Sequence, residues 1–465
     1  MSLDFWEVVE RAKNGPLVTE KTYDLEVFYP KLLEVSRKYE ISYDPSTPVP
    51  CDENLTRRVF EAALEFYSEV GTYCIDTNRI IQFKKEEILE ALRVVPDHVR
   101  FGEGEDSAVM KHRGIEDRNP PCLWLSAGSM PTDEKLFNPI LESFIQEPLA
   151  QIVSMALIPE ISKISIGVGD PTEYWGATRA AAMLNDARVK AGRPGIACGN
   201  AVTTAITTAG IMAATQPRFG LRPSDGYYTP AISELKIDMD RLTRNAFMLD
   251  WDANIGFLFA PIYGGMCGGT NTLAIANVAY YMMGAAVCKA GFYNSLPLHF
   301  NFSTNSHREL LWAVSISLQA ISQFTRLVPV THLYSRNGPA TEEIALECAA
   351  WALVVVPSGG NLAGIGFCGG GDKHKNYCNP LDTRLLGEIG HGVVGMGRKE
   401  ACSIVNTLLD KYEEGLDKGY DTGRPFTELY DVKSRAPLPE TVRHYEAMKF
   451  QLEELGIPFG EPVKK

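Results

Sequence analysis

The sequence lacks the patterns that mark several special classes of protein. Its ten cysteines include no CxxC pair, which argues against a zinc ribbon or a redox motif. No apolar run approaches the ~20 residues that a membrane-spanning helix needs. The first residues, MSLDFWEVVERAKNG, form an acidic amphipathic start rather than a signal peptide or an Arg-rich transit peptide. We therefore expect a cytoplasmic protein with free thiols, no metal site and no membrane partner.

Positive charge is also scarce. The 45 Lys and Arg residues are outnumbered by 58 Asp and Glu residues, the formal net charge is −13, and no dense Lys/Arg run is present. A nucleic-acid surface normally shows a basic patch, so we expect no nucleic-acid partner. The hydrophobic fraction of 45% and the charged fraction of 22% are typical of a soluble globular protein.

Two glycine-rich stretches, at 264–269 and 369–371, match neither a P-loop nor the dinucleotide-binding fingerprint. Glycine-rich loops after strands can hold an anion with their backbone N–H groups, or they can simply be tight turns. For 264–269 both interpretations stand. For 369–371 a turn is favoured.

Apolar periodicity divides the chain into a helical start and a longer region of alternating strands and helices. Residues 1–100 are predicted to be mainly helical, with helices at 54–70 and 85–95 and a short hairpin or loop at 71–83. The strands predicted after residue 120 are 122–127, 163–168, 195–198, 232–236, 254–260, 296–302, 327–331 and 361–367. The helices predicted there are 173–190, 201–214, 239–250, 270–290, 306–325, 341–355, 383–416 and 440–455.

Repeated strand-then-helix order predicts a parallel sheet with right-handed crossovers. Eight strand candidates predict a closed (β/α)8 TIM-type barrel, and a doubly wound open sheet is the alternative. We expect residues 1–100 to form a helical N-terminal extension packed on the barrel. Residues 101–465 then form the barrel with its C-terminal helices.

The stretch AGRPGIACGN at 191–200 combines a helix end, a turn and a short strand. Gly192 suits a left-handed helix cap and Pro194 favours a turn. The strand that follows would present Cys198, Gly199 and Asn200 at its carboxyl end, where α/β enzymes commonly place their chemistry. Cys198 is a candidate nucleophile, although a buried inert thiol is the preferred interpretation.

Two pairs of polar residues lie in predicted strands or just after them. His299 shares a strand face with Asn301, and His332 shares one with Tyr334, because side chains alternate across a strand. At the ends of successive strands the two pairs are candidates for a shared site, against the alternative that each histidine is a satisfied core residue.

Several motifs together resemble the monomethylamine:corrinoid methyltransferase family of methylotrophic methanogens. They are AGRPG (191–195), SELKIDMD (233–240), PIYGGMCGG (261–269), LPLHF with STNSHRE (296–309), NGPATE (337–342) and VGTYCIDTNRI (70–80). The resemblance covers nearly the whole chain. It implies a (β/α)8 barrel, a homo-oligomer, hexameric in the family, and no tightly bound cofactor. It also implies a partner corrinoid protein that docks at the barrel mouth and supplies the cobalt.

The resemblance breaks at the family's reacting residue. Without gaps, the family's pyrrolysine falls on Gly199, and its two glutamates fall on Tyr228 and Leu258. The family's glutamine and tyrosine before the GP motif fall on His332 and Tyr334. We therefore expect His332 and Tyr334 to be catalytic. We expect the substrate to be bound by Gly199, Asn200, Tyr228, Leu258, His299 and Asn301, around an empty volume above Gly199.

These departures predict a corrinoid-dependent methyltransferase without pyrrolysine, acting on a small methylated amine, with quaternary amines among the candidate substrates. Aromatic faces suit a quaternary ammonium, and the candidates are Tyr227, Tyr228, Phe257, Phe259, Tyr263 and Tyr334. One alternative is a catalytically inactive barrel homologue that acts as a small-molecule binding or regulatory protein. Another is an unrelated barrel chemistry built on His299, His332 and Cys198.

Overall fold

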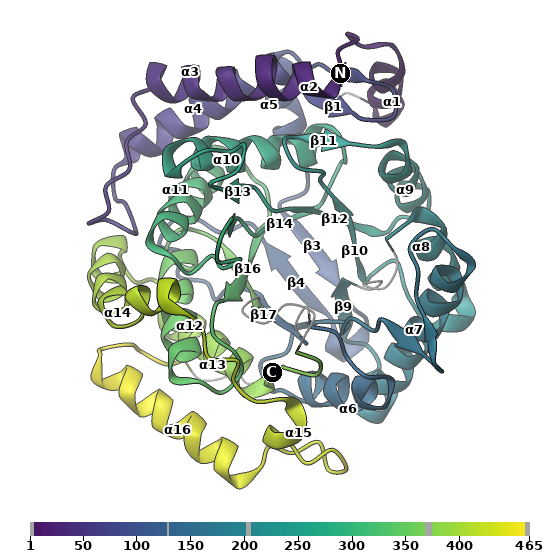
Figure 1. Ribbon diagram of the computed structural model, residues 1–465, viewed down its shortest axis with the longest axis vertical. Helices are drawn as coiled ribbons and strands as arrows, with labels where there is room; N and C mark the ends of the chain where they lie inside the picture. The colour runs from purple at the N-terminus through teal and green to yellow at the C-terminus, as the bar shows by residue number, and fades with distance from the viewer. Residues whose placement is uncertain (1–3, 128–129, 201–205, 368–373, 461–465) are drawn as a thin grey trace.

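The computed structural model describes residues 4–127, 130–200, 206–367 and 374–460. Eight parallel strands curve into a barrel with helices around the outside (Figure 1). Along the sheet they follow the order β10-β12-β14-β16-β17-β5-β6-β9. Their bounds are β5 Leu123–Ser126, β6 Ile152–Ser154, β9 Ala197–Asn200, β10 Gly226–Pro230, β12 Asn254–Phe259, β14 Phe292–Ser295, β16 Pro329–Ser335 and β17 Asn361–Phe367. The predicted (β/α)8 barrel is confirmed.

Three of the predicted strands are wrong. The barrel uses β6, β10 and β14, each shortly before an apolar run in the chain: 163–168, 232–236 and 296–302. The true strands are short or carry Tyr, Thr, Asn and Ser, so their polarity is typical of a loop. The predicted runs instead contribute to small ladders outside the barrel, in which β7 (Glu160–Ile161) pairs with β8 (Ile164–Ser165), β13 (Ile262–Tyr263) pairs with β15 (Leu298–His299), and β11 (Lys236–Ile237) pairs with the N-terminal extension.

The helices that follow the barrel strands mostly agree with the apolar periodicity, but the first of them, α6, was not predicted. They are α6 Glu134–Ile145, α7 Pro171–Lys190, α8 Thr208–Ala214, α9 Met239–Asp250, α10 Thr270–Ala286, α11 Arg308–Phe324, α12 Glu342–Val355, α13 Pro380–Gly392, α14 Arg398–Lys418 and α16 Pro439–Glu454, with short η3 Pro217–Phe219 and α15 Phe426–Leu429. The helix predicted at 383–416 is two helices, because the chain turns between them at Gly395, whose φ is +76°. Of the described helices, none has the length and apolarity needed to cross a bilayer.

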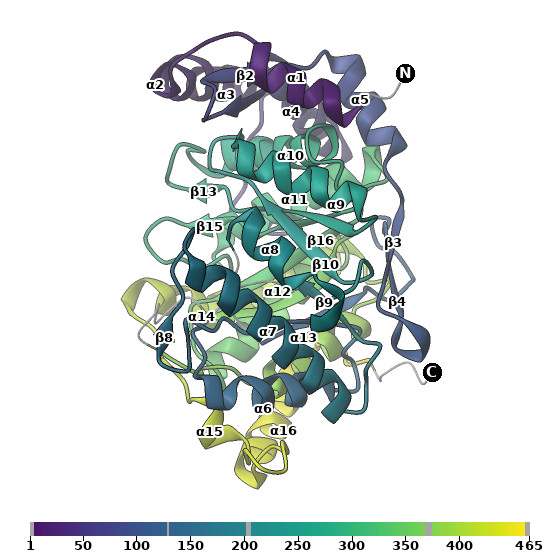
Figure 2. The ribbon, with the colours of Figure 1, turned by 90° about the vertical axis from the view of Figure 1, so that its right-hand side faces the viewer.

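The N-terminal extension forms a layer over one side of the barrel (Figure 2). It contains α1 Phe5–Asn14, α2 Glu20–Thr22, η1 Tyr23–Phe28, α3 Tyr29–Lys38, α4 Glu53–Val70, α5 Lys85–Val94 and the hairpin β1 Thr72–Cys74 with β2 Arg79–Ile81. Helix α4 packs on α10 and α11, and β1 pairs with β11, which follows barrel strand β10 in the chain. Buried Lys236 fixes this junction, because its Nζ lies 2.8 Å from carboxylate oxygens of both Glu20 and Asp24.

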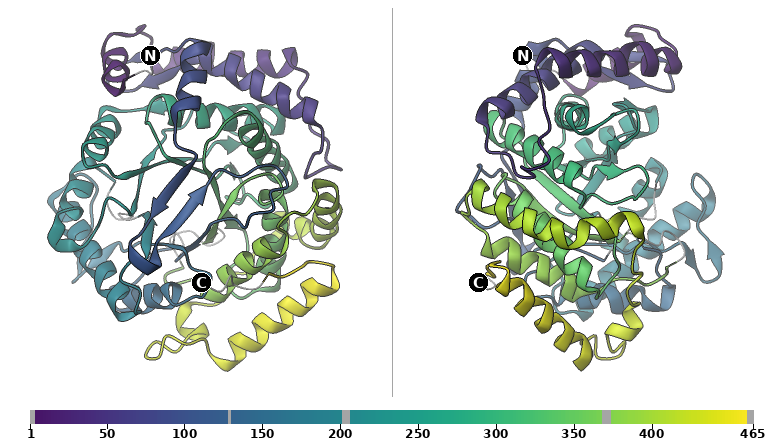
Figure 3. Two further views of the ribbon diagram at one scale, coloured as in Figure 1. Left: turned by 180° about the vertical axis from the view of Figure 1, so that it is seen from behind. Right: turned by 60° about the vertical axis from the view of Figure 1, so that its left-hand side comes forward.

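A hairpin covers the amino-terminal end of the barrel (Figure 3). Its strands are β3 His98–Phe101 and β4 Ala108–Lys111, joined through η2 Gly104–Asp106. Val99, Phe101 and Met110 pack into the barrel interior. The expected boundary between extension and barrel, at residue 100, falls within this hairpin and stays a prediction.

The barrel closes at a seam between β9 and β10, where no ladder joins the described strands. Their backbones nevertheless approach closely, since a Cβ added to Gly226 would lie 2.3 Å from the carbonyl oxygen of Gly199. A buried carboxylate bridges the seam. Asp225, just before β10, accepts hydrogen bonds from the backbone N–H of Cys198 on β9 and from the guanidinium of Arg188 on α7.

Candidate active site

The barrel interior is lined by aromatic and amide side chains. They are Trp124, Tyr228, Phe292, Asn294, His332 and Tyr334, from four different strands. The Trp124 indole stacks on Tyr228, with ring centroids 5.7 Å apart and an interplanar angle of 17°. It meets Phe292 and His332 edge-on, at 6.1 and 6.0 Å. The structure thus brings Tyr228, His332 and Tyr334 together, as the sequence predicts, around a tryptophan that the sequence analysis did not single out.

Trp124 occupies the place that the sequence analysis left empty. A Cβ added to Gly199 would lie 2.4 Å from Cζ2 of Trp124, so the indole packs directly on the glycine backbone. The indole is 1% exposed, and its N–H donates a 2.6 Å hydrogen bond to Oγ of Ser154. The expectation of an empty volume directly over Gly199 is therefore wrong. A flat aromatic wall stands there instead.

A short polar network crosses the same region. The Asn294 amide nitrogen donates to the Tyr228 hydroxyl at 2.6 Å and lies 3.2 Å from Nδ1 of His332. Its amide oxygen is buried and has no hydrogen-bond partner among the described residues. Burial lowers the pKa of His332 to about 4, so the ring is neutral at pH 7. Burial also raises the pKa of Tyr228 well above 10, so that its hydroxyl stays protonated.

The barrel strands carry very little formal charge. Within their described bounds, none of the eight contains Asp, Glu, Lys or Arg. His332 is the one histidine on them, and it is neutral. These strands therefore offer hydrogen bonds and π faces to a ligand but no carboxylate that could take up a proton.

The remaining predicted site residues lie at different distances from this group. Leu258 packs against the interior cluster from β12, and Asn200 ends β9 half-buried. His299 and Asn301 belong to β15 and the turn after it, outside the eight-stranded sheet. The backbone N–H of Asn301 donates to Nδ1 of His299, so the two do not share a strand face.

Two expectations about the site residues lose their structural basis: a chemistry that uses Cys198, and a role in the site for Tyr227, Phe257 and Phe259. Cys198 points away from the interior into the helix layer, and burial raises the pKa of its thiol to about 12. Tyr227, Phe257 and Phe259 also face the helices, contrary to the prediction that they line the site. Tyr227 and Tyr228 are neighbours on β10, and strand alternation sends only Tyr228 inward.

The interior group also contains three residues that the sequence did not predict as site residues: Trp124, Phe292 and Asn294. Trp124 lies in the predicted strand 122–127, in which apolar residues fill consecutive positions, so alternation gives no sign of which side faces inward. Phe292 and Asn294 precede the apolar run 296–302, outside the predicted strand, although their two-residue spacing is that of one strand face. That spacing was the available signal.

The glycine-rich loop 264–269 is a turn in the structure. The Gly264 N–H donates to the Gly268 carbonyl at 2.9 Å, and Cys267 between them is buried. The other glycine-rich stretch, 369–371, lies outside the described residues.

Comparison with known proteins assigns the chain. The sequence model of monomethylamine methyltransferase MtmB matches residues 3–457. The chain belongs to the MtmB family. Monomethylamine methyltransferase MtmB of Methanosarcina mazei is 27% identical over 465 residues, covering 98% of this chain and 99% of the relative. MtmB2 of Methanosarcina acetivorans is 27% identical over 462 residues, with the same coverage.

The fold agrees with solved structures of the family. The crystal structure of Methanosarcina barkeri MtmB matches with a TM-score of 0.93 at 26% identity, covering 98% of this chain and 99% of that one. A crystal structure of a hydroxylamine complex of MtmB matches equally well. The MtmB relatives are named as methyltransferases, and this chain is therefore a member of a methyltransferase family.

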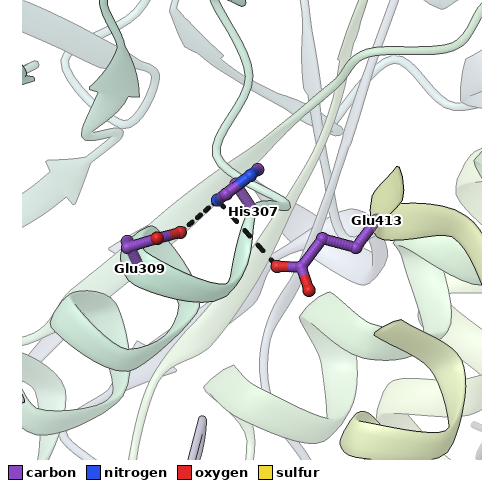
Figure 4. A group of neighbouring side chains, drawn as sticks. All are labelled: His307, Glu309 and Glu413. Carbon is purple, nitrogen blue, oxygen red and sulfur yellow. Dashed lines mark hydrogen bonds and ion pairs between the residues drawn. The ribbon is translucent and has the colours of Figure 1, made fainter. Parts of the chain in front are cut away.

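A cluster of ionisable groups lies where α11 of this MtmB-family barrel begins (Figure 4). The imidazole N–H of His307 donates to Glu309, and Nδ1 lies 3.9 Å from Glu413 of α14. The ligating atoms of these three residues all lie within 4.8 Å of one another, a spacing that a cation could use. Both oxygens of Glu413 already accept hydrogen bonds from Arg308, at 2.9 and 3.0 Å. We interpret the cluster as an ion-pair network, and the absence of a metal site stays a prediction.

Replacing His307 with asparagine should cost more stability at pH 6 than at pH 9. Burial opposes the charged ring, but the hydrogen bond to Glu309 and the nearby carboxylates outweigh it and raise the pKa of His307 above its usual 6.5. The contribution is therefore complete below about pH 6.5 and is lost as the pH rises through the raised value. We expect a loss of about 1 kcal/mol at pH 6, measured by urea denaturation.

His444→Asn is the matched control for this pH dependence. Burial lowers the pKa of His444, so its replacement should cost less at low pH than at high pH. A loss for His307→Asn that is constant between pH 6 and pH 9 would contradict the ion-pair interpretation.

Proposed function

We propose that this protein is a corrinoid-dependent methyltransferase that works without pyrrolysine. It transfers a methyl group from a small quaternary ammonium compound to the cobalt of a partner corrinoid protein, which docks at the barrel mouth. The proposal takes the methylated-amine substrate and the corrinoid partner from the family resemblance, and the quaternary class from the side chains of the barrel. A homo-oligomer is proposed on the same resemblance, with the hexamer of the family as the expected form.

The single observation that carries the proposal is the Trp124 indole packed on Gly199. In place of a long reacting side chain, the barrel presents the stacked pair of Trp124 and Tyr228 with Phe292 beside them. The faces of aromatic rings attract a quaternary ammonium through the ring quadrupole, and a buried setting strengthens that attraction. A small primary ammonium would instead require acceptors for its N–H groups.

The neutral strands fit a donor that needs no proton transfer. When the methyl carbon of a quaternary ammonium is attacked by Co(I), the C–N bond breaks and its electron pair stays on nitrogen. The leaving group is then a neutral tertiary amine, and no carboxylate or imine is required to activate it. His332 and Tyr334 are proposed to orient the donor, with the neutral imidazole and the hydroxyl as hydrogen-bonding groups.

Methyl transfer can be followed directly in the corrinoid spectrum. Purified protein is mixed with its cognate corrinoid protein in the Co(I) state, together with tetramethylammonium, betaines, choline or simple methylamines. We expect methyl-Co(III) to form with at least one quaternary compound. If none of these compounds yields methyl-Co(III), the proposal is refuted. Binding that calorimetry detects without methyl transfer would support a small-molecule binding protein instead.

Two substitutions at Trp124 distinguish the contribution of its aromatic face to ligand binding from that of its volume. Trp124→Leu should weaken tetramethylammonium binding roughly 5- to 30-fold, since a cation–π contact contributes about 1–2 kcal/mol. Trp124→Phe should keep most of the affinity. Trp351, fully buried on α12, gives the matched control, because Trp351→Leu removes an indole of equal size away from the barrel interior. If calorimetry gives the same affinity for Trp124→Leu and the unchanged protein, then the Trp124 ring is not part of the binding site.

A further inference from the structure

Strand β16 extends beyond its neighbour on one side. It pairs with β14 as far as Thr331, which lies opposite Ser295, the last residue of β14. His332 and Tyr334 lie beyond that point. A buried strand edge without a neighbour would leave peptide groups unpaired, which proteins avoid. Something other than a strand must therefore complete this edge.

The side chain of Asn305 completes it. Its amide nitrogen donates to the carbonyl of His332 at 2.7 Å, and its amide oxygen accepts from the N–H of Tyr334 at 2.8 Å. Its own backbone N–H donates to the carbonyl of Tyr334 at 3.2 Å. Asn305 is 0% exposed. One residue thus satisfies three peptide groups on either side of Leu333.

This bonding pattern is that of a parallel ladder. In such a ladder, one residue donates to the carbonyl before the residue opposite it and accepts from the N–H after it. The Asn305 amide bears that relation to Leu333, so the side chain takes the place of a missing strand residue. These hydrogen bonds therefore hold the two peptide units between His332 and Tyr334, which are the predicted catalytic residues.

Hydrogen bonds from the residues on either side of Asn305 hold it in place. Thr304 Oγ1 donates to the Tyr334 carbonyl at 2.7 Å. Ser306 Oγ donates to Glu347 at 2.5 Å, and the same buried carboxylate accepts the backbone N–H groups of Arg336 and Asn337 at 2.7 and 3.0 Å. Glu347 lies on α12, so the segment 304–306 is held between a barrel helix and the end of β16.

We propose that Asn305 is a positioning residue, which fixes the backbone that carries His332 and Tyr334 by acting as a substitute strand residue. Its consequence for methyl transfer rests on the proposed function. The effect on the backbone does not, so the two parts can fail separately.

Hydrogen exchange tests the backbone part without any substrate. In the full-length protein with Asn305→Ala, amide exchange in the peptide 329–335 should be at least tenfold faster, while the other barrel strands are unchanged. Asn305→Asp keeps the shape but turns an acceptor oxygen towards the His332 carbonyl, so it should act in the same direction. The matched control is Asn277→Ala, which removes a buried amide that bonds Ser295 rather than β16. Unchanged exchange at 329–335 in both Asn305 variants would overturn the proposal.

Single-turnover methyl transfer tests the functional part. Its rate constant does not depend on the folded fraction, and we expect it to fall at least tenfold for Asn305→Ala and Asn305→Asp. Thr304→Ser, which keeps the hydroxyl, should react as fast as the unchanged protein, whereas Thr304→Val should be slower. Faster exchange at 329–335 with an unaltered rate constant would overturn the positioning role. If the unchanged protein transfers no methyl group, the proposed function fails and the exchange result still decides the backbone part.

Discussion

Replacing Gly199 with alanine should destabilise the protein by about 1–3 kcal/mol, the usual cost of extra volume in a packed core. The new methyl carbon would lie 2.4 Å from the Trp124 ring, which is itself held by Tyr228 and by Ser154. The ring cannot move aside without breaking one of these contacts. Urea denaturation at neutral pH measures the loss.

The double variant shows whether Trp124 is the cause. Trp124→Ala alone should cost about 3–5 kcal/mol, because a large buried side chain is removed. In that background Gly199→Ala should cost almost nothing, giving a coupling energy of about 1–3 kcal/mol between neighbouring sites. Gly415→Ala is the control, since a Cβ there meets no atom within 4 Å and a helix favours alanine. Additive costs at 199 and 124 would mean that the two residues do not compete for one space.

This competition explains what the sequence could show of the site. The motifs around 191–200 and 332–334 located the barrel mouth, and strand alternation correctly paired His332 with Tyr334. The sequence could not predict which residue faces Gly199. Trp124 lies 75 residues earlier in the chain and contacts Gly199 only when the barrel forms. A missing side chain in a packed interior is normally compensated by a neighbour, so an expected void is often filled.

The misplaced strands have a common physical origin. Sequence periodicity is a sign of burial, and the apolar runs 232–236 and 296–302 are indeed partly buried, but outside the barrel sheet. The run 163–168 is mostly exposed, with Ile164 45% and Val168 60% exposed. The real strands β10 and β14 are buried on both faces while carrying Tyr, Thr, Asn and Ser. Those polar groups are satisfied by tertiary partners, for example Thr229 by Asn245 of α9 and Ser295 by Asn277 of α10. Such partners are invisible to a local pattern.

The helical elements were easier to predict, since their cause is local. Helix α4 shows its apolar stripe and has an Asp52 cap that accepts from two backbone N–H groups. Helix α7 likewise begins after Asp170 and ends where Gly192 takes a positive φ of 76°. Polar bonds between distant segments, such as those of Asn305 or Asp225, have no comparable local signal.

The second large effect is expected at the barrel seam. Asp225→Ala should destabilise the protein by about 3–5 kcal/mol, the range found when one partner of a buried ion pair is removed. Asp225 and Arg188 are both 0% exposed in their side chains. The same carboxylate accepts from the N–H groups of Cys198 and Arg222, at 2.9 and 3.0 Å. Its loss leaves a buried guanidinium and a strand N–H unpaired where β9 and β10 have no ladder.

Two further variants separate charge from hydrogen bonding at this seam. Asp225→Asn keeps an acceptor for Cys198 but removes the negative charge, so its loss in urea denaturation should be intermediate. Asp186→Ala removes a carboxylate from an exposed pair with Lys190 on the same helix as Arg188, and should cost less than about 1 kcal/mol. If Asp225→Ala costs no more than Asp186→Ala, then the seam is held by packing of the glycine backbones alone. Our interpretation requires the opposite, because two strands without a ladder still need a partner for each buried peptide group.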